Sequence, residues 1–341
     1  MSEEHPIRGV YESCIGVPDL FESTRFWQSF GYRMVAHGHL DAAKVKALYG
    51  VDSALESVQL RHKQCDHSYV RLMRWEKPIN AGIGITKNLR QDGNRWGVML
   101  TRSIFNIMNH AEDAAAQGQP WIVTHPHWLQ VYAMEKGEPF IDAPIGVREG
   151  LILHPFYRLA LFERYNYEKP TYGDIDDNSF LKTSQFTHHG ILIRNDDAAV
   201  LDFYHEVLGL LKQKEHLLGG KPTCSSGNKE VYDLDDTEQY YIHDFDDPRS
   251  SLEIAGHLSG RLKIVRMKES SEMPDVREQS RPGCLGMTLL TYQVRDIGDY
   301  RKRVIEGGAS RVTEVADNEL GSPSFSFYAP DGNPYALVGN L

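Results

Sequence analysis

Apolar and polar positions form a strand–turn–helix pattern over residues 186–210, near the middle of the chain. From Gly190 to Arg194, isoleucines at alternate positions give the two-residue period of a half-buried strand. The acidic turn at residues 195–197 can cap the start of a helix, and Gly209 can end it. The apolar residues between them recur at helical spacing. They are Val200, Leu201, Phe203, Tyr204, Val207 and Leu208.

The same pattern occurs near the N-terminus, so the chain contains an internal repeat. An aromatic pair that begins at Phe26 follows Asp19 at the offset at which the pair beginning at Phe203 follows Asp196. Repeats of one supersecondary unit indicate that the copies pack on a common core. We therefore expect the helices of these two segments to be equivalent.

Four such units can be traced, each a strand, a helix and three further strands. The second begins near Trp96, and the fourth near Met287. A stretch rich in Pro, Gly and Asp separates the second unit from the third. We therefore predict an α+β fold of four βαβββ modules, paired into two tandem domains. The boundaries are 1–165 for the first domain, 166–184 for the linker and 185–341 for the second domain.

Composition narrows the function classes. The chain has 341 residues and a formal net charge of −10, which argues against nucleic-acid or anionic-membrane partners. No apolar run reaches the roughly 20 residues that cross a bilayer, and the start lacks a secretory signal. The four cysteines are widely spaced, without a metal-binding or disulfide framework. We expect a cytoplasmic protein.

The strand with His, the acidic turn and the helix ending in F-Y-x-x-V-L-G resemble the opening of a module in the vicinal oxygen chelate superfamily. That superfamily includes glyoxalase I, extradiol dioxygenases and bleomycin-resistance proteins. The resemblance implies a divalent metal ion (Fe, Mn, Zn or Ni) in a cup between paired modules. Its usual ligands are a His in a module's first strand and a Glu in its last strand.

In the third module, the resemblance places the His ligand at His188 or His189. Counting from the aromatic pair selects His189, whereas strand alternation selects His188, and we favour His189. The carboxylate ligand would be Glu253, because DDPRSSLEI resembles the end of such a module with one residue missing. His243 is the candidate for a further metal ligand, with His216 and His257 less well placed.

The other modules depart from the family pattern. The positions matching His and Glu in the fourth module are Leu289 and Ala336. The corresponding first-strand positions are Glu12 in the first module and about Met99 in the second. A usual dioxygenase site therefore cannot be assembled by direct correspondence, and the first domain is expected to be silent.

Two further sets of residues carry candidate chemistry. Tyr241 and Tyr292 are candidates for hydrogen-bond donors or general acids towards a substrate oxygen. His125 and His127 could share one strand face, as a metal site, an aromatic-lined cleft or a surface loop. We expect these two histidines to lie away from the relevant cup.

Two functions remain open. The first is a metal-dependent enzyme acting on a small oxygen-rich or aromatic substrate, either a ring-cleaving dioxygenase or a lyase or isomerase. The second is a metal-free protein that binds or sequesters a small molecule, as bleomycin-resistance proteins do. The partner in both is a small molecule, and a homodimer is the assembly that we consider.

Overall fold

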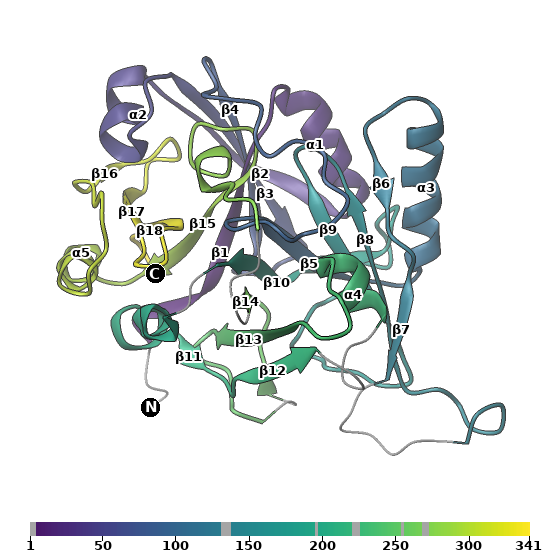
Figure 1. The fold of residues 1–341 in the computed structure, drawn as a ribbon. Helices are drawn as coiled ribbons and strands as arrows, with labels where there is room; N and C mark the ends of the chain where they lie inside the picture. Colours follow the sequence, from purple (N-terminus) through teal and green to yellow (C-terminus); the bar gives the residue numbers. More distant parts are fainter. Residues whose placement is uncertain (1–4, 131–137, 195–196, 220–225, 254–255, 268–272) are drawn as a thin grey trace.

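The computed structural model describes residues 5–130, 138–194, 197–219, 226–253, 256–267 and 273–341. Within these residues the chain forms two large mixed sheets and several helices (Figure 1), which confirms the predicted α+β class. The first sheet has the order β16 (Ala316–Asp317), β17 (Pro323–Tyr328), β18 (Pro334–Val338), β15 (Gly286–Val294), β1 (Ile7–Gly16), β4 (Tyr69–Trp75), β3 (Leu55–His62) and β2 (Tyr32–Leu40).

The second sheet has the same plan. Its order is β11 (Leu211–Lys212), β13 (Gln239–Asp246), β14 (Arg261–Met267), β10 (Thr183–Ile193), β5 (Arg95–Thr101), β9 (Arg158–Tyr165), β8 (Gly146–Leu153) and β6 (Ile122–Val123). Two short strands extend it, since β12 (His216–Gly219) pairs with β13 and β7 (His127–Gln130) pairs with β8. Each sheet has an antiparallel pair at its centre, β1 with β15 and β5 with β10.

The sheets combine modules differently from our prediction. The first and fourth modules form the first sheet, and the second and third modules form the second sheet. Each sheet therefore draws strands from both 1–165 and 185–341. The predicted pairing of consecutive modules is wrong for the sheets, because the antiparallel contacts of β1 with β15 and of β5 with β10 join segments on opposite sides of the linker.

A helix or helical turn follows the strand that opens each module. The helices and helical turns are α1 (Leu20–Ser29), α2 (Ala42–Tyr49), α3 (Ile104–Ala116), η1 (Ala198–Leu201), η2 (Phe203–Val207), α4 (Ser226–Tyr232), η4 (Arg277–Gln279) and α5 (Ile297–Glu306). Of these, α2, α4 and η4 lie between other strands. Asp19 caps α1 by accepting a hydrogen bond from the backbone N–H of Glu22.

The segment that we expected to match α1 is not one regular helix. Asp197 caps a 3₁₀ turn, η1, and a π-helical turn, η2, follows it. In η2 the backbone N–H of Leu208 donates to the carbonyl of Phe203, five residues earlier. Asn195 and Asp196, the other residues of the predicted cap, lie outside the described residues.

The two sheets share a core. One buried cluster joins Ile7 and Tyr292 of the first sheet to Ile191 and Phe245 of the second. A second cluster joins Leu72 of β4 to Leu161 of β9, among others. The two sheets therefore pack back to back, and each keeps its other face for a separate cup.

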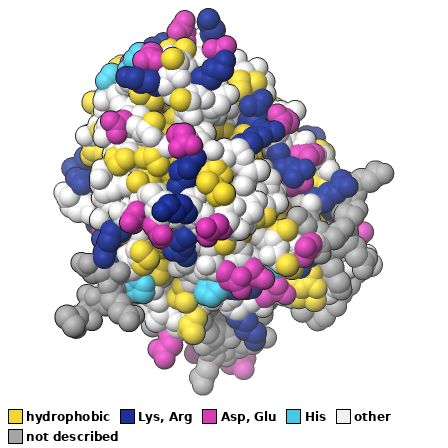
Figure 2. All heavy atoms as spheres, turned by 90° about the vertical axis from the view of Figure 1, so that its left-hand side faces the viewer, with side chains coloured by type: hydrophobic (Ala, Val, Ile, Leu, Met, Phe, Trp, Pro, Cys, Tyr) yellow, Lys and Arg dark blue, Asp and Glu magenta, His cyan; other side chains and the backbone are white. Residues whose placement is uncertain are grey.

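The surface on the left side of Figure 1 has Lys and Arg side chains interspersed with Asp and Glu (Figure 2). This face therefore has no large patch of one sign. None of the helices among the described residues is long and apolar enough to cross a membrane.

Candidate functional site

The cup of the first sheet is filled by the protein's own side chains. Leu48 and Tyr49 of α2 are buried in one cluster with Cys14, Leu289 and Ala336 of the sheet. The helix therefore covers the face that would otherwise be open to a ligand.

A buried ion network occupies the polar part of this cup. The Arg71 side chain donates from Nε to Oε1 of Glu12 at 2.9 Å, and from Nη1 to Oε1 of Glu319 at 3.1 Å. A second contact joins Arg71 to Oε2 of Glu12. Arg71 is 1% exposed and Glu12 is fully buried.

Neutral donors complete the network. The Gln59 amide donates to Glu12 at 2.6 Å, and the Thr291 hydroxyl donates to the same carboxylate at 2.8 Å. Glu319 accepts from the hydroxyls of Ser57 at 2.8 Å and Tyr49 at 2.9 Å. Both buried carboxylates are thus paired and hydrogen-bonded, which is the condition for burying a charge.

This network explains why the first cup is not a ligand site. Glu12 stands at the position that the resemblance assigns to a metal ligand, but the Arg71 guanidinium already neutralises it. A fixed cation there opposes the binding of a second one. Glu12 therefore has a structural role.

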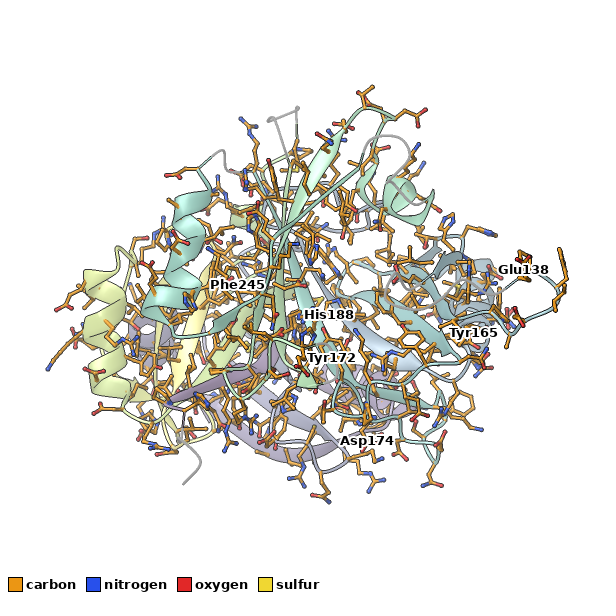
Figure 3. All side chains as sticks on the ribbon, turned by 90° about the horizontal axis from the view of Figure 1, so that it is seen from below. Glu138, Tyr165, Tyr172, Asp174, His188 and Phe245 are labelled. Carbon is orange, nitrogen blue, oxygen red and sulfur yellow. The ribbon has the colours of Figure 1, made fainter. Side chains whose placement is uncertain are left out.

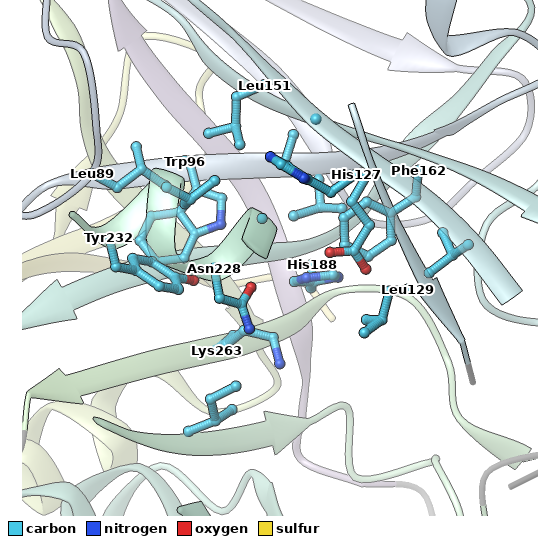
Figure 4. A pocket seen from close by; sticks show the side chains of 18 of the residues that line it. Leu89, Trp96, His127, Leu129, Leu151, Phe162, His188, Asn228, Tyr232 and Lys263 are labelled. Atoms are coloured by element: carbon cyan, nitrogen blue, oxygen red, sulfur yellow. The ribbon is translucent and has the colours of Figure 1, made fainter. Parts of the chain in front are cut away.

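The cup of the second sheet is open. It holds a cavity of about 320 Å³ lined by residues of both predicted domains. Trp96 and Tyr232 lie on one side of it, Phe162 and Leu129 lie on the other, and His188 lies between them (Figure 4). The apolar floor belongs to a buried cluster that includes Trp96, Val98, Leu151 and Tyr240.

Gly190 makes room for this floor. A Cβ atom added at Gly190 would lie 2.0 Å from the Trp96 indole. The glycine therefore lets the indole lie across strand β10 beside His188. This close approach is a packing reason for glycine within a strand.

His188 lines the cavity, and the protein holds one of its ring nitrogens. Its Nδ1 lies 3.1 Å from the Tyr172 hydroxyl and 3.0 Å from the Thr187 hydroxyl. The Thr187 hydroxyl donates to the carbonyl of Val98 at 3.2 Å, so its oxygen is available to accept from Nδ1–H. This arrangement favours the tautomer with hydrogen on Nδ1, which leaves Nε2 as an acceptor.

The charge state of His188 agrees with that role. Burial lowers the pKa of His188 well below its usual range, and the nearby cations Lys263 and Arg261 lower it further. The ring is therefore neutral at physiological pH. Figure 3 shows His188 and Tyr172 next to each other near the centre of the molecule.

Glu149 is the one carboxyl group among the described residues that line this cavity. Burial raises the pKa of Glu149 to about 7, although the charge of Lys263 acts in the opposite direction. Its side chain lines the cavity and makes no hydrogen bond to another described side chain. A carboxyl group with a pKa near neutrality is suited to accept and return a proton.

Four basic side chains lie at the polar end of the cavity: Arg164, Lys169, Arg261 and Lys263. Arg261 and Lys263 are paired with Asp244, at 2.7 and 2.9 Å. Arg261 also contacts Asp246. No ion pair to a described carboxylate is present for the other two.

The inner strands do not offer a metal-ligand set. His188 faces the cup in register with Val98 of β5 and Arg261 of β14, and Val98 is in register with Ala160 of β9. Only His188 among these four has a side chain that binds divalent metals readily. No group of three or more His, Cys, Asp or Glu residues in the described part of the chain could hold an ion. The residues present therefore do not fit the family's metal site.

Of the two predicted His positions, His188 faces the cup and His189 does not. His189 points to the opposite face, where its ring packs on Phe186 at 4.7 Å. Burial lowers the pKa of His189 to about 3, and neither ring nitrogen has a partner among the described residues. Alternation identified the correct residue, and our preference for His189 was wrong for the cup.

Glu253 lies outside the cup. It is exposed in the turn region between β13 and β14, where its backbone N–H donates to the Ser251 hydroxyl at 3.2 Å. Asp247 organises this region by accepting a bond from the backbone N–H of Ser250 at 2.8 Å and by pairing with Arg249. The chain therefore turns where we expected the last strand, so the prediction that Glu253 and His188 share a cavity is wrong.

The remaining candidates lie on other faces. On β13, Tyr240 and Ile242 line the cavity, so Tyr241 and His243 point away from it. His243 lies 3.1 Å from Glu215, and Tyr241 packs beneath the guanidinium of Arg266 at 4.4 Å.

Tyr292 is fully buried in the core between the sheets. His216 is exposed on β12, and Nδ1 of His257 accepts a hydrogen bond from Nη2 of Arg261 at 2.9 Å. None of these residues lines the cavity. His127, in contrast, does line it, and pairs with Glu230 at 2.7 Å. Our expectation that His127 lies away from the relevant cup was therefore wrong.

Sequence reasoning missed Glu149, Lys169 and Lys263. Glu149 has a recognisable signal, since it alternates with Val147 and Leu151 and so places a carboxyl group on an apolar strand face. Lys169 lies in the segment that we assigned to the linker, which hid its contribution. Lys263 alternates with Arg261 and Val265 on β14. We had expected the last strand of this module earlier in the chain, around Glu253.

Comparison with known proteins supports the fold. Glyoxalase I from Zea mays aligns over 97% of this chain and 92% of its own, with 13% identity and a TM-score of 0.55. A protein from Bacillus subtilis described as a candidate dioxygenase aligns over 98% of this chain and 86% of its own, with 11% identity and a TM-score of 0.51. No protein-family model and no curated protein sequence matches the chain. The predicted vicinal oxygen chelate fold is therefore confirmed, while identities this low establish the fold alone.

Proposed function

We propose that the cup of the second sheet binds a small molecule with an apolar or aromatic body, without a metal ion held by the protein. The observation that carries this proposal is the cavity of about 320 Å³ beside His188, with Val98, Arg261 and Ala160 at the matched positions of the inner strands. Apolar walls with a few polar groups are the usual lining of small-molecule sites.

Ligand-observed NMR with neutral aromatic fragments tests this proposal on protein dialysed against EDTA. We expect several fragments to bind. Ala160→Phe should abolish this binding, because the larger side chain fills the cavity that Ala160 lines. Val35→Phe, on the exposed part of β2, is the matched control and should leave binding unchanged. Binding that requires added Mn, Fe, Zn or Ni, or that survives Ala160→Phe, would contradict the proposal.

Glu149 favours a second function, proton transfer on the bound molecule. In its ionised form Glu149 can take a proton from a carbon next to a carbonyl group, and in its neutral form it can return it. The pKa of Glu149 near 7 makes both forms available at neutral pH. Such chemistry belongs to isomerases and lyases, and it uses only groups that the cup contains.

Hydrogen exchange in D₂O tests the second function. Aryl ketones that bind in the first experiment should exchange the proton next to the carbonyl faster with protein than without it. Glu149→Gln should remove the acceleration while binding persists, because the amide fills the same space but cannot accept the proton. If bound ketones show no acceleration, or if Glu149→Gln retains it, the protein is a binder without this chemistry.

A further inference from the structure

The polar end of the open cup has more positive than negative charge. Arg261 and Lys263 are offset by Asp244 and Asp246. Arg164 and Lys169 have no ion pair to a described carboxylate, although both line the cavity. Two cationic side chains therefore remain available to a ligand.

Arg164 is held in place, but its guanidinium keeps N–H donors for a ligand. Its Nη2 donates to the backbone carbonyl of Tyr172 at 3.2 Å, and its Cζ lies 5.6 Å from the ring centre of Tyr167. A guanidinium has five N–H donors in a fork that matches a carboxylate or phosphate group. The Tyr167 side chain also forms a hydrogen bond with the guanidinium, and the remaining N–H donors of the fork are available to a ligand.

Lys169 approaches the same place from the segment after β9. Its Nζ lies 5.7 Å from the ring centre of Tyr172, and the Cζ atoms of Arg164 and Arg261 lie 5.9 and 5.3 Å from that ring. Burial and the neighbouring cations lower the pKa of Lys169 to about 8. Cations on an aromatic face are stabilised by its electron density, but they still repel one another.

These residues also face a second cavity. A polar cavity of about 640 Å³ shares Arg164, Tyr167 and Lys169 with the cup. A charged group could thus meet the two cations from the polar side, while the body of the same molecule lies in the apolar cup. The two cavities therefore give the site a polar end and an apolar end.

We propose that the ligand of the open cup is a small organic anion, whose carboxylate or phosphate head lies between Arg164 and Lys169 and whose apolar body packs against Trp96 and Tyr232. This proposal rests on the proposed small-molecule function and adds the chemical class of the ligand. It follows from the charge imbalance and from the guanidinium fork, which a neutral ligand would leave unpaired.

Calorimetry with three matched series of probes tests the ligand class. The series are phenylalkyl carboxylates with chains of two to four carbons, the corresponding neutral amides and the corresponding phosphates. With EDTA-treated protein at neutral pH, one anionic series should bind about tenfold or more tightly than the amides, since a charge-assisted contact outweighs a neutral one. The tighter of the two anionic series identifies the head group.

Variants of the two cations link this preference to the site. Arg164→Met and Lys169→Met should each weaken anion binding about tenfold and leave amide binding unchanged. Lys302→Met, on the exposed side of α5, is the matched control and should change neither. Lys169→Arg keeps the charge and should retain anion affinity, which separates loss of charge from damage to the fold.

The pH dependence supplies a second readout. Because the pKa of Lys169 is lowered to about 8, anion affinity should fall as the pH rises through that value. Lys169→Arg should remove the fall. Equal affinity for acids and amides, or unchanged anion affinity in both Met variants, would overturn the ligand class while leaving the small-molecule site intact. Binding of every series that survives Ala160→Phe, or no binding of any probe, would instead contradict the site itself.

Discussion

The Tyr172 hydroxyl lies 3.1 Å from Nδ1 of His188, so a residue from the segment predicted as a linker orients the histidine of the open cup. Tyr172 also presents its ring to Arg164 and Lys169. Tyr172 therefore contacts both His188, the hydrogen-bond acceptor of the cup, and the two cations Arg164 and Lys169. The polar end of the site is thus built by the predicted linker segment together with strand β10.

Tyr172→Phe tests that connection. Loss of the hydroxyl should lower the free energy of unfolding by about 1 kcal/mol, since it removes one buried hydrogen bond. It should also weaken anion binding, because Tyr172, whose carbonyl and ring contact Arg164 and Lys169, loses its contact with His188. Urea denaturation and calorimetry measure the two effects. Tyr328→Phe is the control. Its ring stays beneath Arg311, so the substitution should change the free energy of unfolding little. Equal effects in both variants would contradict this role of Tyr172.

Arg71→Met tests the ion network that fills the other cup. We expect it to lower the free energy of unfolding by about 3–5 kcal/mol, since it leaves the carboxylates of Glu12 and Glu319 buried without their cation. Arg74→Met, on the same strand, removes an exposed pair with Glu56 and should cost less than about 1 kcal/mol.

If Arg71→Met and Arg74→Met lower the free energy of unfolding by the same amount, the buried ion network does not stabilise the first cup as we expect. Ligand binding gives an independent check. A folded Arg71→Met variant should bind the probes of the open cup as the unchanged protein does, because the two cups lie on different sheets.

Gly190→Ala tests the packing beneath the ligand. The added methyl group would meet the Trp96 indole at 2.0 Å, so we expect a loss of about 1–3 kcal/mol from overpacking, together with weaker ligand binding. Gly298→Ala in α5 meets nothing closer than 3.5 Å and should be neutral or slightly stabilising. Denaturation of both variants measures the difference. A Gly190→Ala variant with normal stability and binding would show that the Trp96 indole does not require a glycine at position 190.

Glu149 should make stability depend on pH in a defined direction. Its pKa in the folded protein is raised to about 7, above the unfolded value, so the folded state binds more protons between these two values. Stability should therefore fall as the pH rises from about 5 to about 8, on the order of 2 kcal/mol from this group. Glu149→Gln should remove this part of the pH dependence. An identical slope in the variant would contradict the raised pKa.

The sequence predicted much of the local structure. Alternation over residues 186–194 identified the face that carries His188, and the acidic residues Asp19 and Asp197 mark the starts of helical turns. Counting between aromatic pairs failed at His189, because a 3₁₀ turn and a π turn follow the strand in place of a regular helix. Local patterns thus fixed which residues share a face, but not how many residues each turn uses.

The sheet pairing and the site required the three-dimensional structure. Contacts between β1 and β15 join positions nearly the whole chain apart, and no periodic pattern specifies them. The position assigned to Glu253 depended on one missing residue in a loop, and the chain turns there instead. The role of Lys169 depends on tertiary contacts with Tyr172, so its charge could not be interpreted from its neighbours in sequence.

A crystal structure of EDTA-treated protein with 4-phenylbutanoate tests the central claim most directly. We predict electron density for the probe in the open cup, with its ring against Trp96 and its carboxylate beside Arg164, and no metal ion at His188. A metal ion retained by His188 despite EDTA, or a probe bound elsewhere while this cup stays empty of it, would contradict the account.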